Sequence, residues 1–443
     1  MRRLFGTLFL LLIAVAGFCK GPKYIFYFIG DGMGPSHVLG TELYLGELQG
    51  VIGTPQRLCF TQFPYTAFVT TYSASNGVTD SAASGTALAT GTKTRNGRIG
   101  VDENGKDIYS VAWAAKEAGM AVGIATTVCI NHATPSAFYA HNTSRNNYHE
   151  IAQWMLTADY EFYAGGDAKC SNEQREELYG NACRNGYTIA RGYNDYLAKA
   201  NNAEKMMLYQ EEPAEVIPYT IDRTPADLTL AQITEAGIDF LYGKKKEGFF
   251  MMVEGGKIDY ASHSDDVATV FHEVLDFNAA IEVAYEFYKK HKDETLIIVT
   301  ADHETGGLVL GYKGDYSLSL KELEKQKVSI DRLKEILSTL KETTWGDITS
   351  IVRHNTGMEP RGSHPADESV TMTGELAGKI AWEAIYDLYR KAAISWASGN
   401  HSGTFVPLFA IGEEADEFHG VMDNTDIPKT IKRVAGLEKK NRK

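Results

Sequence analysis

Short apolar stretches that stop abruptly at a carboxylate, a histidine or a glycine turn recur along this chain. The strands expected from these stretches span residues 23–29, 121–127, 249–253 and 296–300. The first ends at Gly30-Asp31-Gly32-Met33-Gly34, the third at Glu254 and the fourth at Asp302-His303. In a parallel sheet the carboxyl ends of the strands share one edge, where α/β proteins assemble their sites. The pattern therefore predicts a parallel sheet whose edge collects side chains able to bind metal.

Amphipathic helices separate these strands. They are expected at residues 108–118, 229–242 and 268–290, and each is long enough to cross over a parallel sheet. A last short strand is expected at 408–411, after Asn400-His401-Ser402-Gly403. The predicted fold class is therefore α/β, with a doubly wound, largely parallel central sheet flanked by helices.

Residues from about 312 to 397 interrupt this alternation with a Lys/Glu-rich helical stretch, a loop rich in Gly, Pro and His, and a further helix. We interpret this segment as a helical and loop insertion. A chain of 443 residues exceeds the length at which single cores usually stop growing, but α/β enzymes reach it through insertions into one large sheet. Residues 20–443 are therefore expected to form a single domain.

Residues 1–18 have the composition of a signal peptide. Arg2 and Arg3 precede an apolar run over residues 4–15, and small residues follow the run. The run is too short to span a bilayer comfortably, so we expect export to the periplasm or the medium without stable membrane insertion. A lipid anchor on Cys19 is the alternative, which the bulky Phe18 disfavours.

Net charge and cysteine content restrict the expected partners and disulfides. The formal net charge of −13 argues against a nucleic-acid partner, because phosphate backbones are bound through a basic surface excess. Cys170 and Cys183 flank a polar segment that contains glycine, and in an oxidising compartment we expect them to form a disulfide. Cys59 and Cys129 are expected to be buried as small hydrophobic residues.

A hydroxyl group stands behind an acidic residue and ahead of a run of small residues in Thr79-Asp80-Ser81-Ala82-Ala83. The small residues suit a tightly packed helix start, where backbone N–H groups and the helix dipole attract an anion. Ser81 is therefore a candidate nucleophile that would carry a phosphoryl group. The alternative is that Asp80 or Ser81 only caps a helix.

Carboxylate and imidazole side chains recur at spacings that suit shared metal ions. Asp259 and His263 are four residues apart and lie on one face if the segment is helical. Asp302 and His303 are adjacent at a strand end, and Asp31 is expected at the same edge. Ligands of these types without cysteine suit zinc in a catalytic site. Each pair alone has another interpretation, as a salt bridge or a hydrogen-bonded structural histidine.

In their order along the chain these motifs resemble those of the alkaline phosphatases, a family of secreted, metal-dependent phosphomonoesterases. The matching segments span nearly the whole mature chain and are Gly30-Asp31-Gly32-Met33-Gly34, Thr79-Asp80-Ser81-Ala82-Ala83, Ala133-Thr134-Pro135, Thr143-Ser144-Arg145, Glu254-Gly255-Gly256-Lys257-Ile258-Asp259 with His263, Val299-Thr300-Ala301-Asp302-His303, and His401-Ser402-Gly403. The resemblance implies a single catalytic domain over residues 20–443 that hydrolyses small phosphate monoesters to an alcohol and inorganic phosphate. It also implies a homodimer.

The resemblance further implies three metal sites beside a phosphoserine-forming Ser81. One zinc ion would be held by Asp259, His263 and His401, the second by Asp31, Asp302 and His303, and a third ion, usually magnesium, by Asp31, Thr134 and Glu254. Two zinc ions about 4 Å apart can stabilise the attacking and leaving oxygens of an in-line displacement at phosphorus. Arg145 would grip two phosphate oxygens with its planar guanidinium. The alternative role for Arg145 is a surface ion pair.

Two positions depart from the best-known bacterial pattern. His132 stands in place of an aspartate near the third metal, as in the mammalian branch, and Tyr260 stands in place of a lysine or histidine that approaches the phosphate through water. The phenol of Tyr260 is neutral at neutral pH, which bears on phosphate affinity and on the preference for monoesters over diesters. The alternatives to a phosphomonoesterase are a phosphodiesterase or sulfatase with the same two-metal arrangement, and a catalytically silent phosphate-binding module.

Overall fold

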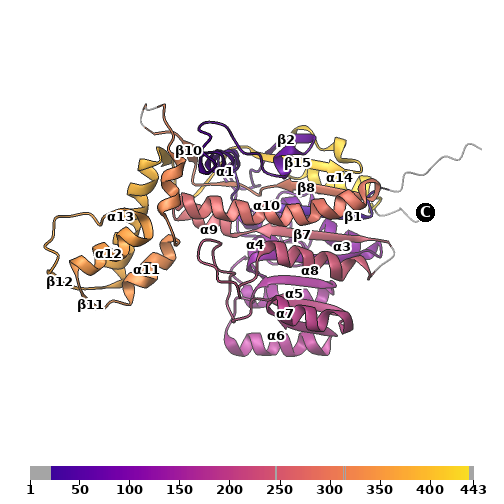
Figure 1. The fold of residues 1–443 in the computed structure, drawn as a ribbon. Helices are drawn as coiled ribbons and strands as arrows, with labels where there is room; N and C mark the ends of the chain where they lie inside the picture. Colours follow the sequence, from indigo (N-terminus) through magenta and orange to yellow (C-terminus); the bar gives the residue numbers. More distant parts are fainter. Residues whose placement is uncertain (1–20, 245–246, 313, 315, 439–443) are drawn as a thin grey trace, which may run out of the picture.

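A ten-stranded sheet forms the centre of the molecule in the computed structural model, which describes residues 21–244, 247–312, 314 and 316–438 (Figure 1). The expected signal peptide at 1–18 and Cys19 lie outside the described residues. The strands of the sheet are β1 (Tyr24–Gly30), β2 (Tyr65–Thr70), β3 (Ala121–Cys129), β4 (Phe162–Gly166), β5 (Tyr187–Arg191), β6 (Lys205–Tyr209), β7 (Phe249–Gly255), β8 (Thr295–Thr300), β15 (Val406–Gly412) and β16 (Gly420–Asp423). The five strands predicted from the sequence are confirmed as β1, β3, β7, β8 and β15.

The strands lie in the order β16-β2-β15-β8-β1-β7-β3-β4-β6-β5. Every neighbouring pair is parallel except the two that β15 makes, because β15 runs antiparallel to both β2 and β8. The prediction of a largely parallel sheet is therefore confirmed. The reversed direction of β15 means that this strand begins at the edge where the parallel strands end.

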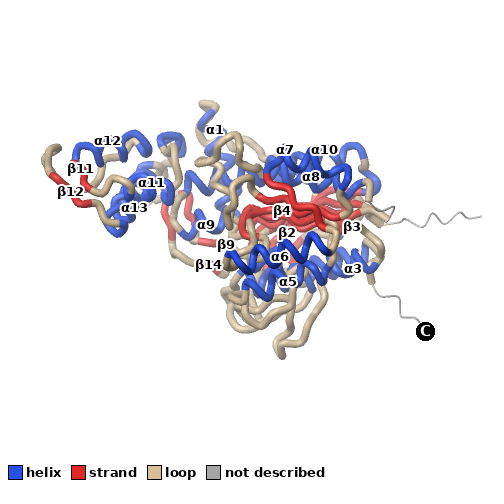
Figure 2. The backbone as a smooth tube through the Cα atoms, turned by 90° about the horizontal axis from the view of Figure 1, so that it is seen from below, coloured by secondary structure: helices blue, strands red, loops and turns tan. Residues whose placement is uncertain are grey.

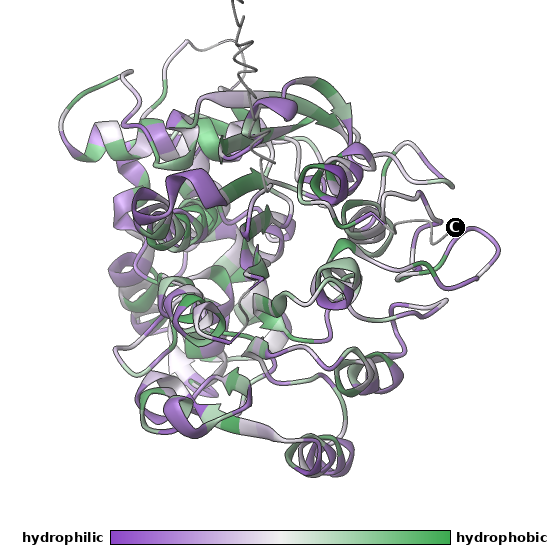
Figure 3. Cartoon of the chain, turned by 90° about the vertical axis from the view of Figure 1, so that its right-hand side faces the viewer, coloured by the Kyte–Doolittle hydropathy of each residue, from purple (hydrophilic) through white to green (hydrophobic). Residues whose placement is uncertain are grey.

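Helices cover both faces of the sheet. In Figure 2, one face carries α7 (Gly192–Lys199), α8 (Leu230–Tyr242) and α10 (Val267–Lys290), and the other carries α3 (Val111–Glu117), α5 (Tyr148–Ala158) and α6 (Asn172–Arg184). Strands covered on both sides need apolar residues at nearly every position, and β1, β3, β7 and β8 meet this requirement. Figure 3 shows the strands as mainly hydrophobic and the helices as divided between hydrophobic and hydrophilic faces. The doubly wound arrangement is therefore confirmed.

The remaining helices of the sheet region are α1 (Pro35–Leu48), α2 (Ser81–Thr90), α4 (Ala133–Ser136), α9 (Lys257–His263) and α14 (Asp426–Val434). The three helices predicted from amphipathic patterns are present as α3, α8 and α10. The helix predicted from residue 108 begins later, because the Ser110 side chain caps α3 by accepting a hydrogen bond from the backbone N–H of Trp113 at 3.2 Å. Among the described helices, none combines the length and the apolar composition that crossing a membrane requires.

The segment of chain that connects β8 to β15 contributes the strands of two short antiparallel ladders. One pairs β9 (Glu304–Thr305) with β14 (His401–Ser402), and the other pairs β10 (Leu308–Leu310) with β13 (Ile394–Trp396). The chain between β10 and β13 includes α11 (Ile330–Ser338), α12 (Trp345–Thr356), α13 (Gly374–Lys391) and the paired strands β11 (Glu342–Thr344) and β12 (Ser369–Thr371). These elements, residues 330–391, form a helical lobe beside one end of the sheet (Figure 1).

Carboxylates of the sheet region hold the first helix of this lobe. Asp266, which is fully buried, accepts hydrogen bonds from the backbone N–H of Ile330 at 2.8 Å and from the Gln326 amide at 2.7 Å. Asp222 accepts a hydrogen bond from the backbone N–H of Ser329 at 2.9 Å. The N–H groups at a helix start have no partner within the helix, so these contacts satisfy them and fix α11 against the start of α10.

The predicted disulfide between Cys170 and Cys183 is wrong. The polar segment between the two cysteines is not a loop but the helix α6, which Ser171 caps at its start. A helix rises about 1.5 Å per residue, so the segment holds the cysteines roughly 18 Å apart, whereas a disulfide needs Cα atoms within about 7 Å. Both thiols are free, with Cys170 half-buried and Cys183 exposed. Cys129 is buried as predicted, and Cys59 is half-buried.

Candidate active site and metal centre

The predicted metal-binding residues follow strands that are neighbours in the sheet. β8, β1, β7 and β3 lie side by side, and the register of β1 places Ile29 opposite Glu254 of β7. Asp31 follows β1 directly, and Asp302 and His303 follow β8. Because these strands are parallel, their carboxyl ends bring the three segments together at one edge of the sheet.

The turn after Asp31 requires glycine. Gly32 has a φ of +75°, and a Cβ atom at this position would lie 2.8 Å from Oγ1 of Thr305 and 3.0 Å from Cα of Asp259. With no side chain in the way, the Gly32 N–H donates a hydrogen bond to Oδ1 of Asp302 at 3.1 Å. The glycine therefore lets the turn pass close to two other segments of the site and orient one of its carboxylates.

His401 reaches the same edge from the opposite direction. It precedes β15, which is antiparallel to β8, so the start of β15 lies where the parallel strands end. The β9–β14 ladder then pairs His401 with Thr305, two residues after His303. This ladder brings His401 and His303 together, and their rings are stacked with centroids 3.5 Å apart.

The first candidate metal group consists of Asp259, His263 and His401, whose ligating atoms lie within 4.8 Å of one another. Asp259 and His263 are one turn apart on α9, as predicted for a helical segment. Nε2 of His263 lies 3.4 Å from Oδ1 of Asp259, and Nε2 of His401 lies 3.6 Å from the same oxygen. The sequence spacing thus placed the first pair correctly, and the fold adds His401.

Hydrogen bonds fix the tautomers of both histidines in this group. Nδ1 of His263 contacts the carbonyl oxygen of Gly399 at 2.8 Å, and Nδ1 of His401 contacts the carbonyl oxygen of Thr79 at 2.8 Å. A carbonyl oxygen can only accept, so each neutral ring carries its proton on Nδ1. Both rings therefore direct the unprotonated Nε2 toward Asp259, as metal ligation requires.

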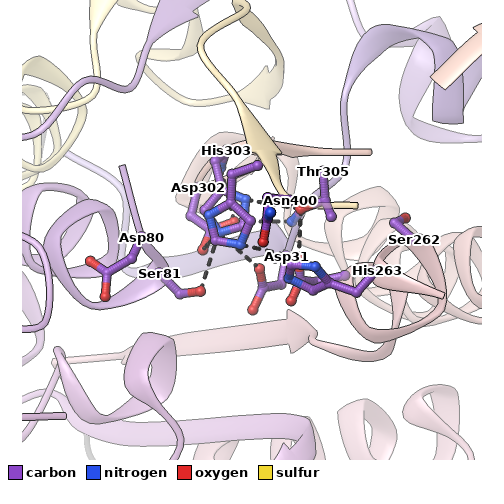
Figure 4. A network of polar contacts seen from close by, with 12 residues as sticks. Asp31, Asp80, Ser81, Ser262, His263, Asp302, His303, Thr305 and Asn400 are labelled. Carbon is purple, nitrogen blue, oxygen red and sulfur yellow. Dashed lines mark hydrogen bonds and ion pairs between the residues drawn. The ribbon is translucent and has the colours of Figure 1, made fainter. Parts of the chain in front are cut away.

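The second candidate group consists of Asp31, Asp302 and His303, and all three side chains are buried (Figure 4). Nε2 of His303 lies 3.4 Å from Oδ1 of Asp31 and 3.2 Å from Oδ2 of Asp302. Nδ1 of His303 lies 3.2 Å from Oγ1 of Thr305, whose hydroxyl donates to Oδ1 of Asp259 at 2.5 Å. The Thr305 oxygen can then accept from Nδ1, so His303 also offers Nε2 to the centre.

Ser81 is the first residue of α2, and its side chain points toward the second group (Figure 4). Asp80 caps this helix by accepting a hydrogen bond from the backbone N–H of Ala83 at 3.0 Å. Oγ of Ser81 lies 3.1 Å from Nε2 of His303. The capping interpretation thus holds for Asp80, while the Ser81 hydroxyl stays available at a positively polarised helix end.

The third candidate group consists of Asp31, His132 and Glu254, all buried. The hydroxyl of Thr126 donates to Oε2 of Glu254 and leaves Oε1 without a protein partner among the described residues. Thr134 lies beside this group, with its hydroxyl 3.3 Å from Oδ2 of Asp302 as donor. Asp31 belongs to both the second and the third groups, so it lies between two sites.

The buried carboxylates of these groups lack the partners that a buried charge needs. Both oxygens of Asp31, Oε1 of Glu254 and Nδ1 of His132 are buried and have no hydrogen-bond partner among the described residues. Burial, and then the nearby Asp302, raise the pKa of Asp31 well above its ordinary value. Burial also raises the pKa of Glu254 to about 8 and that of Asp302 to about 7. Such an oxygen-rich pocket, whose carboxylates need a compensating positive charge, fits divalent cations.

Arg145 bridges the helix cap and the third group. Its Nη1 donates to Oδ2 of Asp80 at 3.1 Å, and its Nη2 lies 3.3 Å from Nε2 of His132. The guanidinium can only donate, so His132 accepts in this arrangement. Burial, and then the positive charge of Arg145, lower the pKa of His132 to about 3, so the ring is neutral. The ion pair with Asp80 is at the site rather than on the outer surface, and it orients the guanidinium.

Tyr260 packs against His132. The two rings meet edge to face with centroids 5.7 Å apart. Burial raises the pKa of the Tyr260 phenol, which is therefore neutral. The ammonium of Lys257 lies 3.5 Å from the centre of the Tyr219 ring and 5.6 Å from that of Tyr260.

Sequence reasoning missed the residues that orient the ligands. Thr305 contacts members of two metal groups, and Thr126 orients Glu254. One signal could have found Thr305, because residues two apart in an extended segment face the same side and Thr305 follows His303 by two. The backbone carbonyls of Thr79 and Gly399 could not be found, because no side-chain pattern marks them.

Comparison with known proteins agrees with this geometry. The sequence profile described as alkaline phosphatase matches residues 22–159 and 159–437. Alkaline phosphatase 4 of Bacillus subtilis (strain 168) is 33% identical over 436 residues, which cover 93% of this chain and 88% of the relative. A cold-active alkaline phosphatase from the psychrophile Shewanella sp. has a TM-score of 0.80 and 31% identity, with 94% of this chain and 100% of that chain covered.

A further solved structure is a mutant of the TAB5 alkaline phosphatase in which a histidine is replaced by glutamate and Mg is bound in the M3 site. It has a TM-score of 0.70 and 26% identity, with 95% of this chain and 99% of that chain covered. The matched profile spans most of the chain, and the first relative exceeds 30% identity over nearly all of it. The chain therefore belongs to the alkaline phosphatase family.

Proposed function

We propose that this protein hydrolyses phosphate monoesters to an alcohol and inorganic phosphate through a phosphoserine at Ser81. The observation that carries the proposal is the position of Oγ of Ser81, at a helix start and 3.1 Å from Nε2 of His303, which belongs to a candidate metal group. Membership of the alkaline phosphatase family supports the same reaction. The helix start contributes a positive potential for an anionic phosphoryl group.

The proposed reaction has two displacements at phosphorus. Oγ of Ser81 attacks, the bond between phosphorus and the ester oxygen breaks, and the alcohol leaves with a proton that balances the one lost by the serine hydroxyl. Water then attacks the phosphoserine, and the bond from phosphorus to Oγ breaks to release inorganic phosphate. Asp80, which precedes Ser81, holds Arg145 through a hydrogen bond. From this position the planar guanidinium of Arg145 can bind two phosphate oxygens.

The candidate groups would hold two zinc ions, one on Asp259, His263 and His401 and one on Asp31, Asp302 and His303. Bound there, the ions supply Lewis-acid stabilisation of the attacking and leaving oxygens. The chain's own contribution is to keep all three histidines in the Nδ1-protonated tautomer through Gly399, Thr79 and Thr305.

We propose a third ion, magnesium, on Asp31, Glu254 and Thr134, with His132 and Tyr260 beside it. Within the described part of the chain, Oε1 of Glu254 and both oxygens of Asp31 have no hydrogen-bond partner, and Asp31 belongs to the second group as well. Imidazole suits transition metals better than magnesium, which prefers oxygen ligands, so His132 makes this site a weak one for magnesium. The TAB5 mutant with a glutamate in place of a histidine and Mg in its M3 site is consistent with this influence of a histidine.

The cellular setting follows from the sequence. We propose that residues 1–18 are a signal peptide and that residues 20–443 act in the periplasm or medium as a catalytic domain with an insertion at about 312–397. A homodimer and no nucleic-acid partner are expected. N-terminal sequencing of the exported protein and light scattering after size-exclusion chromatography test cleavage and oligomeric state.

Metal analysis combined with rates on paired substrates tests the function. Purified protein is expected to contain close to two zinc equivalents and to hydrolyse an aryl phosphate monoester much faster than the matching aryl methyl diester. A faster rate on the diester would indicate a phosphodiesterase, and zinc content without hydrolysis of either ester would indicate a phosphate-binding module.

A further inference from the structure

A cavity of about 250 Å³ lies between the metal centre and the helical lobe. His263 contributes to its wall and also belongs to the first candidate metal group. The cavity is also lined by Asp265, after α9, by Asp331 and Lys334 of α11, and by Gly378 and Trp382 of α13. The side chain of His263 is 35% exposed, so its ring reaches from the metal group to the cavity.

The cavity wall is held in place rather than loosely apposed. The buried carboxylate of Asp266 accepts from the backbone N–H of Ile330, at the first turn of α11, and Asp222 accepts from that of Ser329. These bonds tie the helix that carries Asp331 and Lys334 to the region that carries His263. The cavity is therefore preformed, which lowers the entropic cost of binding.

The lining combines a flat apolar surface with hydrogen-bond acceptors. Trp382 is 42% exposed, which leaves part of its indole ring free to stack on a flat group. Asp265 lines the cavity and is half-buried, and its Oδ1 has no hydrogen-bond partner among the described residues, so the carboxylate can accept from a hydroxyl donor. Asp331 supplies a second carboxylate. A flat ring attached to a hydroxyl-bearing unit matches this combination.

Gly378 keeps the cavity open. It lies inside α13, where glycine lowers helix stability relative to alanine. A Cβ atom there would meet only the Lys334 side chain, at 3.5 Å or more, which is ordinary van der Waals contact. Packing therefore does not require glycine at this position, whereas a larger side chain would project toward Lys334 and fill the space.

We propose that this cavity binds the alcohol portion of the ester and selects flat aromatic alcohols with free hydroxyl groups, the class to which nucleosides belong. The inference rests on the proposed function: Ser81 lies beside the second metal group, so the leaving oxygen would face the first group, which contains His263. The ring stacks on Trp382, and the sugar hydroxyls donate to Asp265 and Asp331. At about 250 Å³ the cavity is slightly smaller than most ligand sites, so it can take in no more than one group of this size.

The test compares adenosine 5′-monophosphate with ethyl phosphate, because both release a primary alcohol and differ mainly in the group that would occupy the cavity. We expect the wild-type protein to favour the nucleotide in kcat/KM. Trp382→Ala should lower this preference by about three- to tenfold, and Gly378→Leu should lower it at least as much. The kcat/KM for ethyl phosphate should be unchanged in both variants.

Trp345→Ala is the matched control, because Trp345 lies in the same lobe but outside the cavity, where its ring contacts that of His364 at a tilt. An unchanged preference in both cavity variants, or an equal loss in the control, would overturn the proposal. Equilibrium dialysis with adenosine separates this proposal from the proposed function. If neither ester is hydrolysed, the proposed function fails. Saturable adenosine binding that Gly378→Leu abolishes would still support the proposed cavity site. The absence of saturable adenosine binding would overturn the cavity proposal.

Discussion

The hydroxyl of Thr305 donates to Oδ1 of Asp259 at 2.5 Å while its oxygen lies 3.2 Å from Nδ1 of His303. One side chain thus orients a carboxylate of the first metal group and an imidazole of the second. We predict that Thr305→Val, which keeps the shape and removes the hydroxyl, weakens zinc binding by about 10- to 100-fold. Competition with a chromogenic chelator measures the affinity, and excess zinc should restore activity.

Thr305→Ser is the control for this prediction, because it keeps the hydroxyl and loses only a methyl group. Its zinc affinity should stay close to that of the wild-type protein. Equal zinc affinity in the valine variant would show that Thr305 fills space without orienting the two ligands.

Ser81→Ala removes the proposed nucleophile but leaves every member of the three candidate metal groups in place. Activity is expected to fall by several powers of ten without reaching the rate in water, because metal binding and phosphate binding remain. Acid quenching during turnover of a labelled monoester should trap a phosphoserine in the wild-type protein and none in the variant. Near-normal turnover at unchanged zinc content would exclude Ser81 as the nucleophile.

Arg145→Ala is predicted to weaken phosphate binding more than it slows the chemical step. A two-pronged contact with a charged group contributes about 1.5–3 kcal/mol, so the inhibition constant for inorganic phosphate should rise about ten- to a hundredfold. Arg145→Lys should recover only part of this loss, because an ammonium is a point charge. An unchanged inhibition constant in the alanine variant would assign Arg145 to the Asp80 ion pair alone.

Removal of metal should make the Tm fall as pH rises, which is not expected of the metal-bound protein. The folded-state pKa values of Glu254 and Asp302 are raised to about 8 and about 7 from ordinary values of 4.5 and 3.8. Carboxyls with raised pKa stabilise the fold below their unfolded values and lose that contribution as pH rises through their folded values. Metal-free protein should therefore show a falling Tm between about pH 4 and pH 8.

Thermal unfolding after dialysis against a chelator measures this effect. The protein reloaded with zinc and magnesium is the control, and its Tm should not fall over the same range because the cations neutralise the carboxylates. A Tm that is independent of pH in the metal-free protein would mean that these carboxylates find other compensation.

The edge of the sheet that bears the candidate ligands could be predicted from the sequence, because each of β1, β7 and β8 is a continuous apolar run that is followed at its carboxyl end by polar residues. The sequence was not sufficient for β4 or for the edge strand β5, which are short and flanked by glycine or polar residues, nor for the opposite edge strand β16 and its neighbour β2. The direction of β15 carries no local signal, yet it decides how His401 reaches the centre. Strand direction is set by which neighbours a strand pairs with, which is a property of the whole sheet.

The error at Cys170 and Cys183 has a different cause. The helix α6 between them exposes most of its length and buries only Leu178 and Ala182, so it shows almost no apolar periodicity. The capping signal at Ser171, with Gln174 three residues later, was present and outweighs the glycine within the segment. Cysteine spacing alone does not report whether the intervening chain is rigid and extended.

His132 stands where the best-known bacterial pattern has an aspartate, and we expect this difference to change how the protein binds magnesium. His132 is neutral, with a pKa lowered to about 3, and it is the member of the third candidate group that contacts Arg145. Replacing it with aspartate adds a negative charge and an oxygen ligand beside Asp31 and Glu254. Magnesium prefers oxygen ligands at octahedral geometry, so His132→Asp should bind magnesium more tightly.

Titration of metal-stripped protein with magnesium at fixed zinc measures the half-activation concentration. We expect added magnesium to raise wild-type activity reversibly and the aspartate variant to need a lower concentration. His132→Asn is the matched control, because it removes the imidazole without adding charge and should give a smaller shift. If the half-activation concentration shifts as far in the asparagine variant as in the aspartate variant, loss of the imidazole rather than the added charge is responsible. A half-activation concentration for His132→Asp that equals or exceeds that of the wild-type protein would show that this position does not set the affinity of the third site.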